Sequence, residues 1–149
     1  DGAGTCRAIC GDVMNVEGFF DLVYLDPPYL NARGVGVDYH YFYHFLEGLT
    51  MYDQWTKRLD YNSKHRRLMP QASEWTDAKR IAKAFDRLFA QFQKSILIVS
   101  YRSDGVPSEE ELVNLLKQYK GDVRVEHYGK YKYVLSTNSE SKEILLVGT

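Results

Sequence analysis

The stretch FDLVYLDPPYL, residues 20–30, constrains the fold more than any other part of the chain. Residues 20–25 form a short, nearly continuous apolar run, which predicts a central parallel strand covered on both faces. Asp26 ends this run, and Pro27 and Pro28 lack the N–H groups that a strand needs to continue. The residue before each proline is also restricted to extended geometry. The sequence therefore predicts a stiff loop at the carboxyl end of a strand, where ligands bind in open α/β sheets.

Strands and helices are predicted to alternate along the rest of the chain. Strands are expected over 6–13, 95–102, 122–136 and 142–149, and helices over 39–49, over 75–94 and after Ser108. Ser108 and Glu111 have the spacing of a capping box, which marks the start of the last helix. The alternation predicts an α/β fold with a parallel sheet, and the last two strands predict a terminal antiparallel hairpin.

Composition narrows the class of protein. The 149 residues suffice for one domain with a core, and 44% hydrophobic with 26% charged residues are typical of a soluble globular protein. No apolar run approaches the length of a membrane span, and the start has no signal-peptide pattern. The two cysteines provide no disulfide framework, so a reducing cytoplasm is the expected location.

The net charge of −1 argues against a domain that binds nucleic acid by bulk electrostatics, so local charge matters more. Residues 57–67, KRLDYNSKHRR, concentrate positive charge at Lys64, Arg66 and Arg67 among others. This segment is read either as a solvated loop or as a patch that contacts phosphates.

LDPPY, residues 25–29, resembles the catalytic signature of S-adenosylmethionine-dependent DNA methyltransferases that methylate exocyclic amines. Asp in the first position is most similar to the adenine-N6 enzymes. The segments YHYFYHFLEGL, SILIVSYRSDG and YKYVLSTNSESKEILLVG are similar to downstream parts of bacterial adenine-specific methylases. The resemblance implies a Rossmann-like class I methyltransferase fold, S-adenosylmethionine as cofactor, and DNA as partner.

Amine methylation gives a chemical reason for these residue types. The lone pair of an exocyclic amine is delocalised into the base, so the nitrogen must rehybridise before it accepts a methyl group. Asp26 can accept one N–H, and the resemblance assigns the second acceptor to the carbonyl of Pro27. Pro27 and Pro28 fix both acceptors in advance, which limits reorganisation during the reaction. Tyr29 is expected to stack on a flipped-out base.

Other residues have both a functional and a structural interpretation. The resemblance gives Asp12 and Asp26 a role in binding the cofactor, while the Gly-Asp pair at Asp12 by itself predicts a turn. Asn31 and Arg33 lie in a loop that contacts DNA or is simply a flexible surface loop. Arg102 binds a phosphate or pairs with an acid. No metal site is expected, because His40 and His44 have no third ligand.

No strand leads into DGAGT at the start, and the glycine loop of the family is missing. We therefore expect 1–149 to be an incomplete catalytic domain, the C-terminal part of the fold, with an inserted segment over about 31–74. Cytosine-N4 methylation, methylation of RNA or protein amides, and a non-catalytic module that binds nucleic acid are the alternatives. A homodimer formed through exposed apolar surface and a cognate restriction enzyme are the other expected partners.

Overall fold

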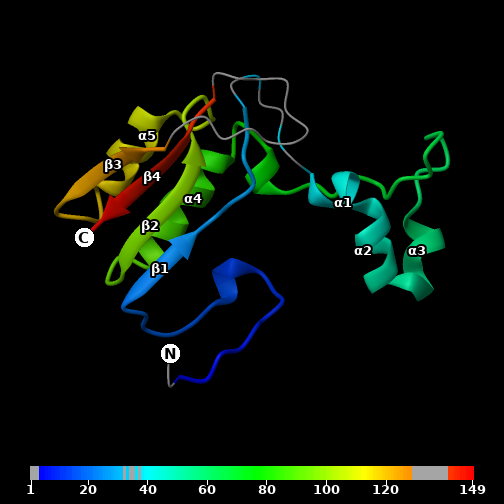
Figure 1. Ribbon diagram of the computed structural model, residues 1–149, viewed down its shortest axis with the longest axis horizontal. Helices are drawn as coiled ribbons and strands as arrows, with labels where there is room; N and C mark the ends of the chain where they lie inside the picture. The colour runs from blue at the N-terminus through cyan, green and yellow to red at the C-terminus, as the bar shows by residue number, and fades with distance from the viewer. Residues whose placement is uncertain (1–3, 32, 34–35, 37, 129–140) are drawn as a thin grey trace.

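The computed structural model describes residues 4–31, 33, 36, 38–128 and 141–149, and its centre is a four-stranded sheet (Figure 1). The strand order is β1-β2-β4-β3. The strands span Leu22–Leu25 (β1), Ile96–Arg102 (β2), Val123–His127 (β3) and Glu143–Gly148 (β4). The protein is thus a mixed α/β structure in which the last strand of the chain inserts between two earlier ones.

The pairing of the strands confirms two predictions. β1 and β2 run parallel, with Leu22 opposite Ile96 and Leu25 opposite Val99. β4 runs antiparallel to both of its neighbours, β2 and β3. The sheet therefore begins parallel and ends with an antiparallel pair. The second half of the predicted strand over 122–136 lies outside the described residues.

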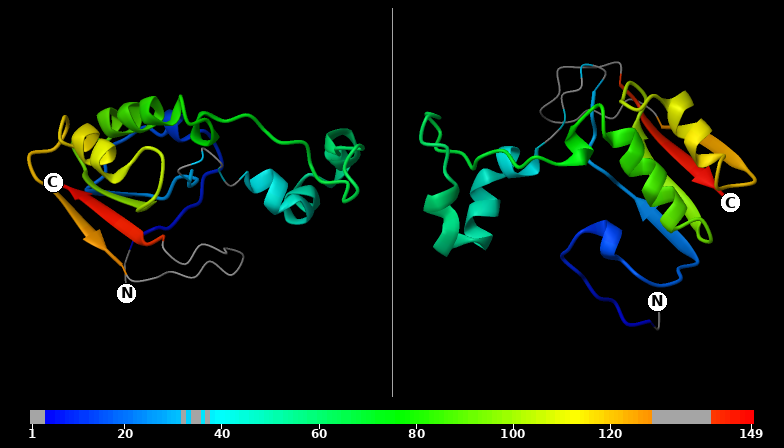
Figure 2. Two further views of the ribbon diagram at one scale, coloured as in Figure 1. Left: turned by 90° about the horizontal axis from the view of Figure 1, so that it is seen from above. Right: turned by 180° about the vertical axis from the view of Figure 1, so that it is seen from behind.

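Two helices, α4 (Ile81–Gln91) and α5 (Glu109–Leu116), cover one face of the sheet (Figure 2). The apolar residues of α4 recur at helical spacing, so one side of the helix is buried. This side packs on the buried strand residues in a single core cluster, which includes Phe85, Phe89, Leu97, Val99, Tyr101, Ile144 and Leu146. The core therefore lies between this helical layer and one face of the sheet.

The start of α5 follows its local capping chemistry. Ser108 accepts a hydrogen bond from the N–H of Glu111, whose carboxylate accepts from the N–H of Ser108, so the predicted capping box is confirmed. The predicted helix over 75–94 is shorter in the structure. A 3-10 turn, η2 (Glu74–Thr76), comes first, and α4 begins only at Ile81. Asp77 explains the delay, because its carboxylate binds the N–H of Lys79 and stabilises a separate turn.

The second face of the sheet has no helix over β1 among the described residues. Leu22, Tyr24 and Ile96 on this face are 49%, 54% and 42% exposed. The prediction of a central strand covered on both faces is therefore wrong for the described part of the chain, because β1 is an edge strand. An apolar run indicates that a strand favours burial, but it does not identify the segment that covers the strand.

The predicted strand over 6–13 is also absent. Residues 4–12 form no strand and are exposed, and they lead into a 3-10 turn, η1 (Val13–Asn15). Ile9 is 70% exposed. A strand exists only where a neighbour pairs with its N–H and C=O groups, and no described segment pairs with these residues.

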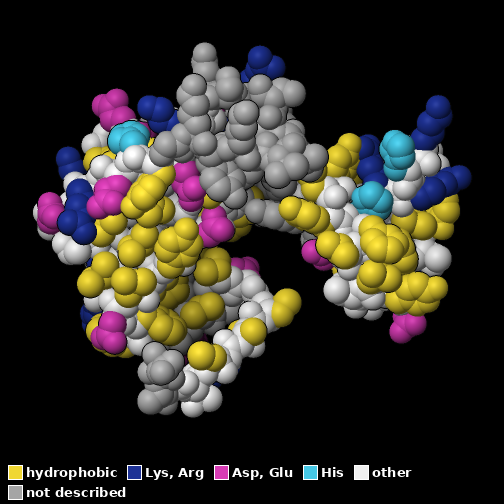
Figure 3. Space-filling model, viewed as in Figure 1, with side chains coloured by type: hydrophobic (Ala, Val, Ile, Leu, Met, Phe, Trp, Pro, Cys, Tyr) yellow, Lys and Arg dark blue, Asp and Glu magenta, His cyan; other side chains and the backbone are white. Residues whose placement is uncertain are grey.

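Residues 38–71 form a helical lobe that stands apart from the sheet (Figures 1 and 3). It contains α1 (Tyr39–Phe42), α2 (His44–Thr50) and α3 (Tyr52–Arg58), so the predicted helix over 39–49 is confirmed with a break at Tyr43. Asp38 closes the base of the lobe, because its carboxylate accepts from the N–H groups of Tyr41 and Gln71, both at 3.2 Å. Across the described residues, no helix has the length and apolar character to cross a membrane.

Replacing Phe85 with alanine tests the position of the core. The ring is fully buried and contacts Trp75, Phe89 and Tyr101 at centroid distances of 5.3–5.6 Å. Phe85→Ala is expected to lower the free energy of unfolding by about 3–5 kcal/mol, measured by urea denaturation. Phe19→Ala is the control: its ring is 71% exposed, and the expected change is within about 0.5 kcal/mol. Equal effects of the two substitutions would contradict this core.

Candidate active site

Asp26, Pro27, Pro28 and Tyr29 follow directly on β1, at the carboxyl end of a strand that pairs in parallel with β2. Asp26 is exposed, Pro27 is buried, and Pro28 and Tyr29 are half-buried. The next residue, Leu30, is fully buried. The loop is thus anchored in the core on both sides of an exposed carboxylate.

The hydroxyl of Tyr101, near the end of β2, holds this loop in place. It accepts a hydrogen bond from the N–H of Leu30 at 3.3 Å and donates to the carbonyl of Val106 at 2.6 Å. The carbonyl of Leu30 in turn accepts from the N–H of Val106 at 3.1 Å. These bonds join the loop after β1 to the loop after β2.

Tyr29 connects Asp26 to two further strands. Its hydroxyl lies 3.0 Å from Oδ1 of Asp26 and 2.9 Å from Oγ of Ser100, on β2. Ser100 also donates to Oε1 of Glu143, the first residue of β4, at 3.0 Å. We call these four groups the carboxylate–hydroxyl network. The ring of Tyr29 stands edge-on to Tyr101, with centroids 5.5 Å apart.

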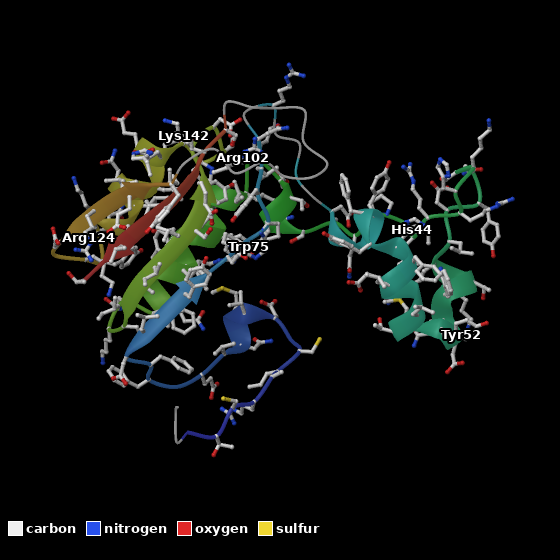
Figure 4. All side chains as sticks on the ribbon, viewed as in Figure 1. His44, Tyr52, Trp75, Arg102, Arg124 and Lys142 are labelled. Atoms are coloured by element: carbon white, nitrogen blue, oxygen red, sulfur yellow. The ribbon has the colours of Figure 1, made fainter. Side chains whose placement is uncertain are left out.

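Arg102 pairs with an acid. Its Nε and one terminal nitrogen bind the carboxylate of Asp104 at 2.7 and 2.9 Å. These hydrogen bonds are the main reason why the pKa of Asp104 lies below its usual range, and Ser141 adds a third donor at 2.6 Å. The guanidinium therefore fixes the turn after β2. Figure 4 shows Arg102 close to Lys142, the residue before β4, and Arg102 pairs with Glu143 in the sheet.

The structure does not bring the two predicted cofactor-binding acids together. Asp12 caps η1 and accepts from the N–H of Met14 at 2.9 Å. Gln91, the last residue of α4, holds η1 by donating to the carbonyls of Val13 and Val16. That end of α4 leads into the start of β2, whereas Asp26 follows the far end of β1.

S-adenosylmethionine needs a cavity with several polar groups, and the described residues do not form one by themselves. A shallow cavity in the helical lobe is lined by Arg58, Leu68, Met69, Pro70 and Gln71, and neither Asp12 nor Asp26 contributes to it. The described part of the chain thus supplies an acceptor side at Asp26 but no complete donor site. It also contains no group of three or more His, Cys, Asp or Glu side chains able to hold a metal ion.

The predicted basic residues have different environments within the helical lobe. Arg67 lies over the ring of Tyr41 at 4.1 Å and is 3.6 Å from the carboxylate of Asp60. Arg66 lies over the ring of Tyr61 at 5.0 Å. Lys64 is exposed, and the described contacts give it no ion pair. Arg67 is therefore part of the lobe's own packing, whereas Lys64 extends into solvent.

Asn31 and Arg33 continue from the motif loop. The side chain of Asn31 accepts from the N–H of Arg33 at 2.9 Å, and Arg33 is exposed. Asn31 also pairs with Gly105 in an isolated bridge, next to the Tyr101 contacts. The structure therefore places both residues beside the motif loop, and the basic segment of the lobe lies on a separate part of the molecule (Figure 3).

Sequence reasoning assigned no role to the partners of the motif, which are Ser100, Tyr101 and Glu143. Ser100 and Tyr101 end the neighbouring parallel strand, so their nearness to Asp26 follows once β1 and β2 are paired. Glu143 carries a weaker signal. It opens a strand that was expected to pair with the preceding one, and only the observed strand order places it beside Ser100.

The sequence is similar to curated methylases over most of its length. It is 29% identical over 134 residues to the modification methylase StsI of Streptococcus sanguinis, a match of 83% of this chain and 18% of the relative. It is 28% identical over 131 residues to the modification methylase LlaI of Lactococcus lactis subsp. lactis, covering 87% and 20%. It is 31% identical over 99 residues to the Type II methyltransferase M.FokI of Planomicrobium okeanokoites, covering 66% and 14%.

These matches indicate that the chain is related to DNA modification methyltransferases. The chain spans a fifth or less of the length of each of the three relatives. No family model matches the chain. No solved structure matches it.

The pH dependence of stability tests the role of Tyr101. Burial raises the pKa of Tyr101 from 10.0 to about 12. The folded state thus holds the proton more tightly, and the resulting stability is fully present below pH 10 and is lost between pH 10 and about pH 12. Tyr101→Phe is expected to remove this loss, which amounts to roughly 2–3 kcal/mol. Below pH 10 the variant should be less stable by about 1–3 kcal/mol, because Leu30 loses a hydrogen-bond acceptor.

Chemical denaturation at a series of pH values measures both effects. Wild type and Tyr101→Phe should differ most near neutral pH and converge as the pH rises towards 12. A constant difference over the whole range would contradict a buried, protonated Tyr101.

Proposed function

We propose that the chain is part of an S-adenosylmethionine-dependent DNA methyltransferase that acts on the exocyclic N6 of a flipped-out adenine. The proposal depends on one observation: Asp26 is an exposed carboxylate at the carboxyl end of β1, held by Tyr29 and the prolines. The similarity to modification methylases over 83% and 87% of the chain supports it. We further propose that 1–149 is an incomplete catalytic domain, the C-terminal part of a Rossmann-like fold.

The proposed chemistry needs two fixed acceptors for the N–H groups of the amine. Asp26 supplies a carboxylate, and the carbonyl of Pro27 is the proposed second acceptor. Both belong to a loop whose backbone is restrained by Pro28 and by the buried Leu30, so little reorganisation is needed when the amine binds. The lone pair is then directed at the electrophilic methyl group that the cofactor supplies. The described residues do not complete the cofactor site, so Asp12 stays a proposed ligand.

Tyr29 is the proposed stacking residue for the base. A base must leave the duplex before its amine can reach Asp26, and stacking on an aromatic ring offsets part of that cost by about 1–3 kcal/mol. The edge-on packing against Tyr101 and the hydroxyl contacts fix the orientation of the ring. A fixed ring loses little side-chain entropy when a base binds.

DNA contacts are proposed for the remaining basic and polar residues. Asn31 and Arg33 lie next to the motif loop, so they are positioned to contact the nucleotides around the flipped base. Lys64 and Arg66 are exposed on the helical lobe. Arg67 and Arg102 already pair with Asp60 and Asp104, so they serve DNA binding mainly by holding their own segments in place.

A homodimer and a cognate restriction enzyme stay predictions of the sequence. The uncovered face of β1, with Leu22 and Tyr24 about half exposed, gives a surface on which a second polypeptide can pack.

Replacing Asp26 with alanine tests the function directly. The full-length gene is expressed in cells, and nucleosides from the cellular DNA are analysed by mass spectrometry. Wild type is expected to produce N6-methyladenine, and Asp26→Ala is expected to reduce it by at least 100-fold, because one acceptor of the amine is lost.

Asp21→Ala is the matched control, because Asp21 is an exposed acid just before β1 and should leave methylation unchanged. N4-methylcytosine in place of N6-methyladenine would change the substrate and keep the mechanism. The absence of both modified bases from wild type would contradict methylation of DNA and favour a non-catalytic module or an RNA substrate.

Substitution of Lys64 tests the proposed DNA contact on the helical lobe. A lysine that neutralises one phosphate releases about one counterion, so Lys64→Ala should reduce the slope of log K against log salt by about 1. Affinity for duplex DNA should fall equally for all sequences. Lys83→Ala, an exposed lysine on α4, is the control and should change neither quantity. An unchanged slope for Lys64→Ala would remove this residue from the DNA interface.

A further inference from the structure

The helical lobe carries a short antiparallel hairpin over residues 58–69, which we call the basic hairpin. Leu59 and Leu68 form an antiparallel bridge, and a backbone hydrogen bond of 2.8 Å lies on either side of this bridge. Leu68 is 1% exposed, whereas most of the tip, residues 61–66, is exposed. The hairpin lies at the outer side of the lobe, away from the sheet (Figures 1 and 2). An ordered base thus presents an exposed tip.

The basic hairpin and its approach carry an excess of positive charge. Within residues 57–67, Asp60 is the sole acid, and Arg67 lies 3.6 Å from its carboxylate. The remaining cations are exposed and form no ion pair with any described residue; they are Lys57, Arg58, Lys64 and Arg66. The whole chain has a net charge of −1, so this excess is local. Such a cluster fits a polyanion.

Arg66, at the tip, has an unusual backbone conformation. Its φ is 47°, in the left-handed region, and among the described residues it is the one non-glycine residue with a positive φ. The Cβ of a side chain is crowded in this region, so turns that need it usually carry glycine or asparagine. Backbone strain of this kind concentrates at functional sites. The arginine side chain is therefore the feature that needs an explanation.

Two contacts orient the guanidinium of Arg66. It lies 5.0 Å from the centroid of the Tyr61 ring, and it donates to the carbonyl of Tyr61. The ring is fixed in turn, because the hydroxyl of Tyr61 donates to the carbonyl of Thr56 on α3 at 3.0 Å. An arginine that is oriented in advance loses less side-chain entropy when it binds a partner. A guanidinium has five N–H donors, so one carbonyl leaves most of them available for an anion.

We propose that the basic hairpin is a preformed contact for the phosphate backbone of duplex DNA, in which Arg66 binds one phosphate through two N–H donors. The choice of DNA as the nucleic acid rests on the proposed function. A planar guanidinium matches two oxygens of one phosphate, whereas Lys64 beside it adds a point charge. Phosphate contacts fix the position of a protein on the duplex without reading its sequence. Arg66 is thus a positioning residue, and the hairpin holds the duplex while Asp26 meets the base.

Arg66→Gly in the full-length protein separates binding from folding. Glycine accepts the left-handed backbone, and this relief offsets the lost contacts with Tyr61, so the urea midpoint should stay close to that of wild type. Affinity is measured by fluorescence anisotropy on a random-sequence duplex of about 30 base pairs, about three helical turns. It should fall by about 10-fold, because charged hydrogen bonds to a phosphate are lost. Unchanged affinity, or a clear fall of the urea midpoint, would overturn the proposal.

Two further variants test the orientation of the guanidinium. Arg66→Lys keeps the charge, so the slope of log K against log salt should stay the same, while affinity should fall by about 3-fold because the planar donor pair is lost. Tyr61→Leu removes the ring beneath the guanidinium and should lower affinity by a similar factor. Wild-type affinity of either variant would overturn a guanidinium that is oriented in advance.

Arg124→Ala is the matched control for the loss of one positive charge. Arg124 is an exposed arginine on β3, and Figure 4 shows it on the side of the sheet that is remote from the lobe. Its affinity for the same duplex should equal that of wild type. A loss as large as that of Arg66→Gly would show an effect of net charge alone and would overturn a contact specific to the basic hairpin.

Competition identifies the nucleic acid. Unlabelled DNA duplex should displace the labelled duplex at lower concentration than RNA duplex of the same sequence, and RNA that competes equally well or better would overturn DNA as the partner. The two proposals can fail separately. A wild type that binds DNA through Arg66 and methylates no base would contradict the proposed function and leave the hairpin contact intact. A wild type that methylates DNA, with full DNA affinity in Arg66→Gly, would overturn the hairpin contact alone.

Discussion

The position of the motif loop depends on one buried side chain. Tyr101 is fully buried, its ring packs against Phe85 of the helical layer, and its other edge meets Tyr29. Its hydroxyl binds the backbone of both loops that follow the parallel strands. Direct contacts of Tyr101 therefore connect the hydrophobic core to the loop that carries Asp26.

Local signals in the sequence predicted the local parts of the fold. The helix that follows Ser108 starts at its capping box, and the buried positions of α4 follow helical spacing. Both patterns relate residues that lie about one helical turn apart, so they can be recognised from a short stretch of sequence. Non-local features were predicted less well. β1 reads as a central strand but lies at an edge, and residues 6–13 read as a strand but have no partner, because pairing depends on segments that a local pattern does not specify.

The candidate site shows the same division. Asp26, Pro27, Pro28 and Tyr29 were found from their own sequence, since an acid and two prolines after an apolar run are a local signal. Their contacts with partners were not predicted, because Ser100 is 71 positions from Tyr29 and Glu143 is 43 positions further on. Asp104, the acid that pairs with Arg102, is only 2 positions away in the sequence. The conformation of the turn determines whether the two side chains contact each other.

Because β4 runs antiparallel to β2, Glu143 lies at the same end of the sheet as Asp26 and is the second acid there. In a purely parallel sheet, only the carboxyl ends of strands meet at one edge, and the loops that follow them supply all the side chains there. Here β4 runs the other way beside β2, with Glu143 opposite Arg102, so its first residue lies where β2 ends. A carboxylate at the start of one strand thus reaches the hydroxyl near the end of the next. Reversing β4 would leave Ser100 with Tyr29 alone and would remove any connection from Asp26 to a second carboxylate.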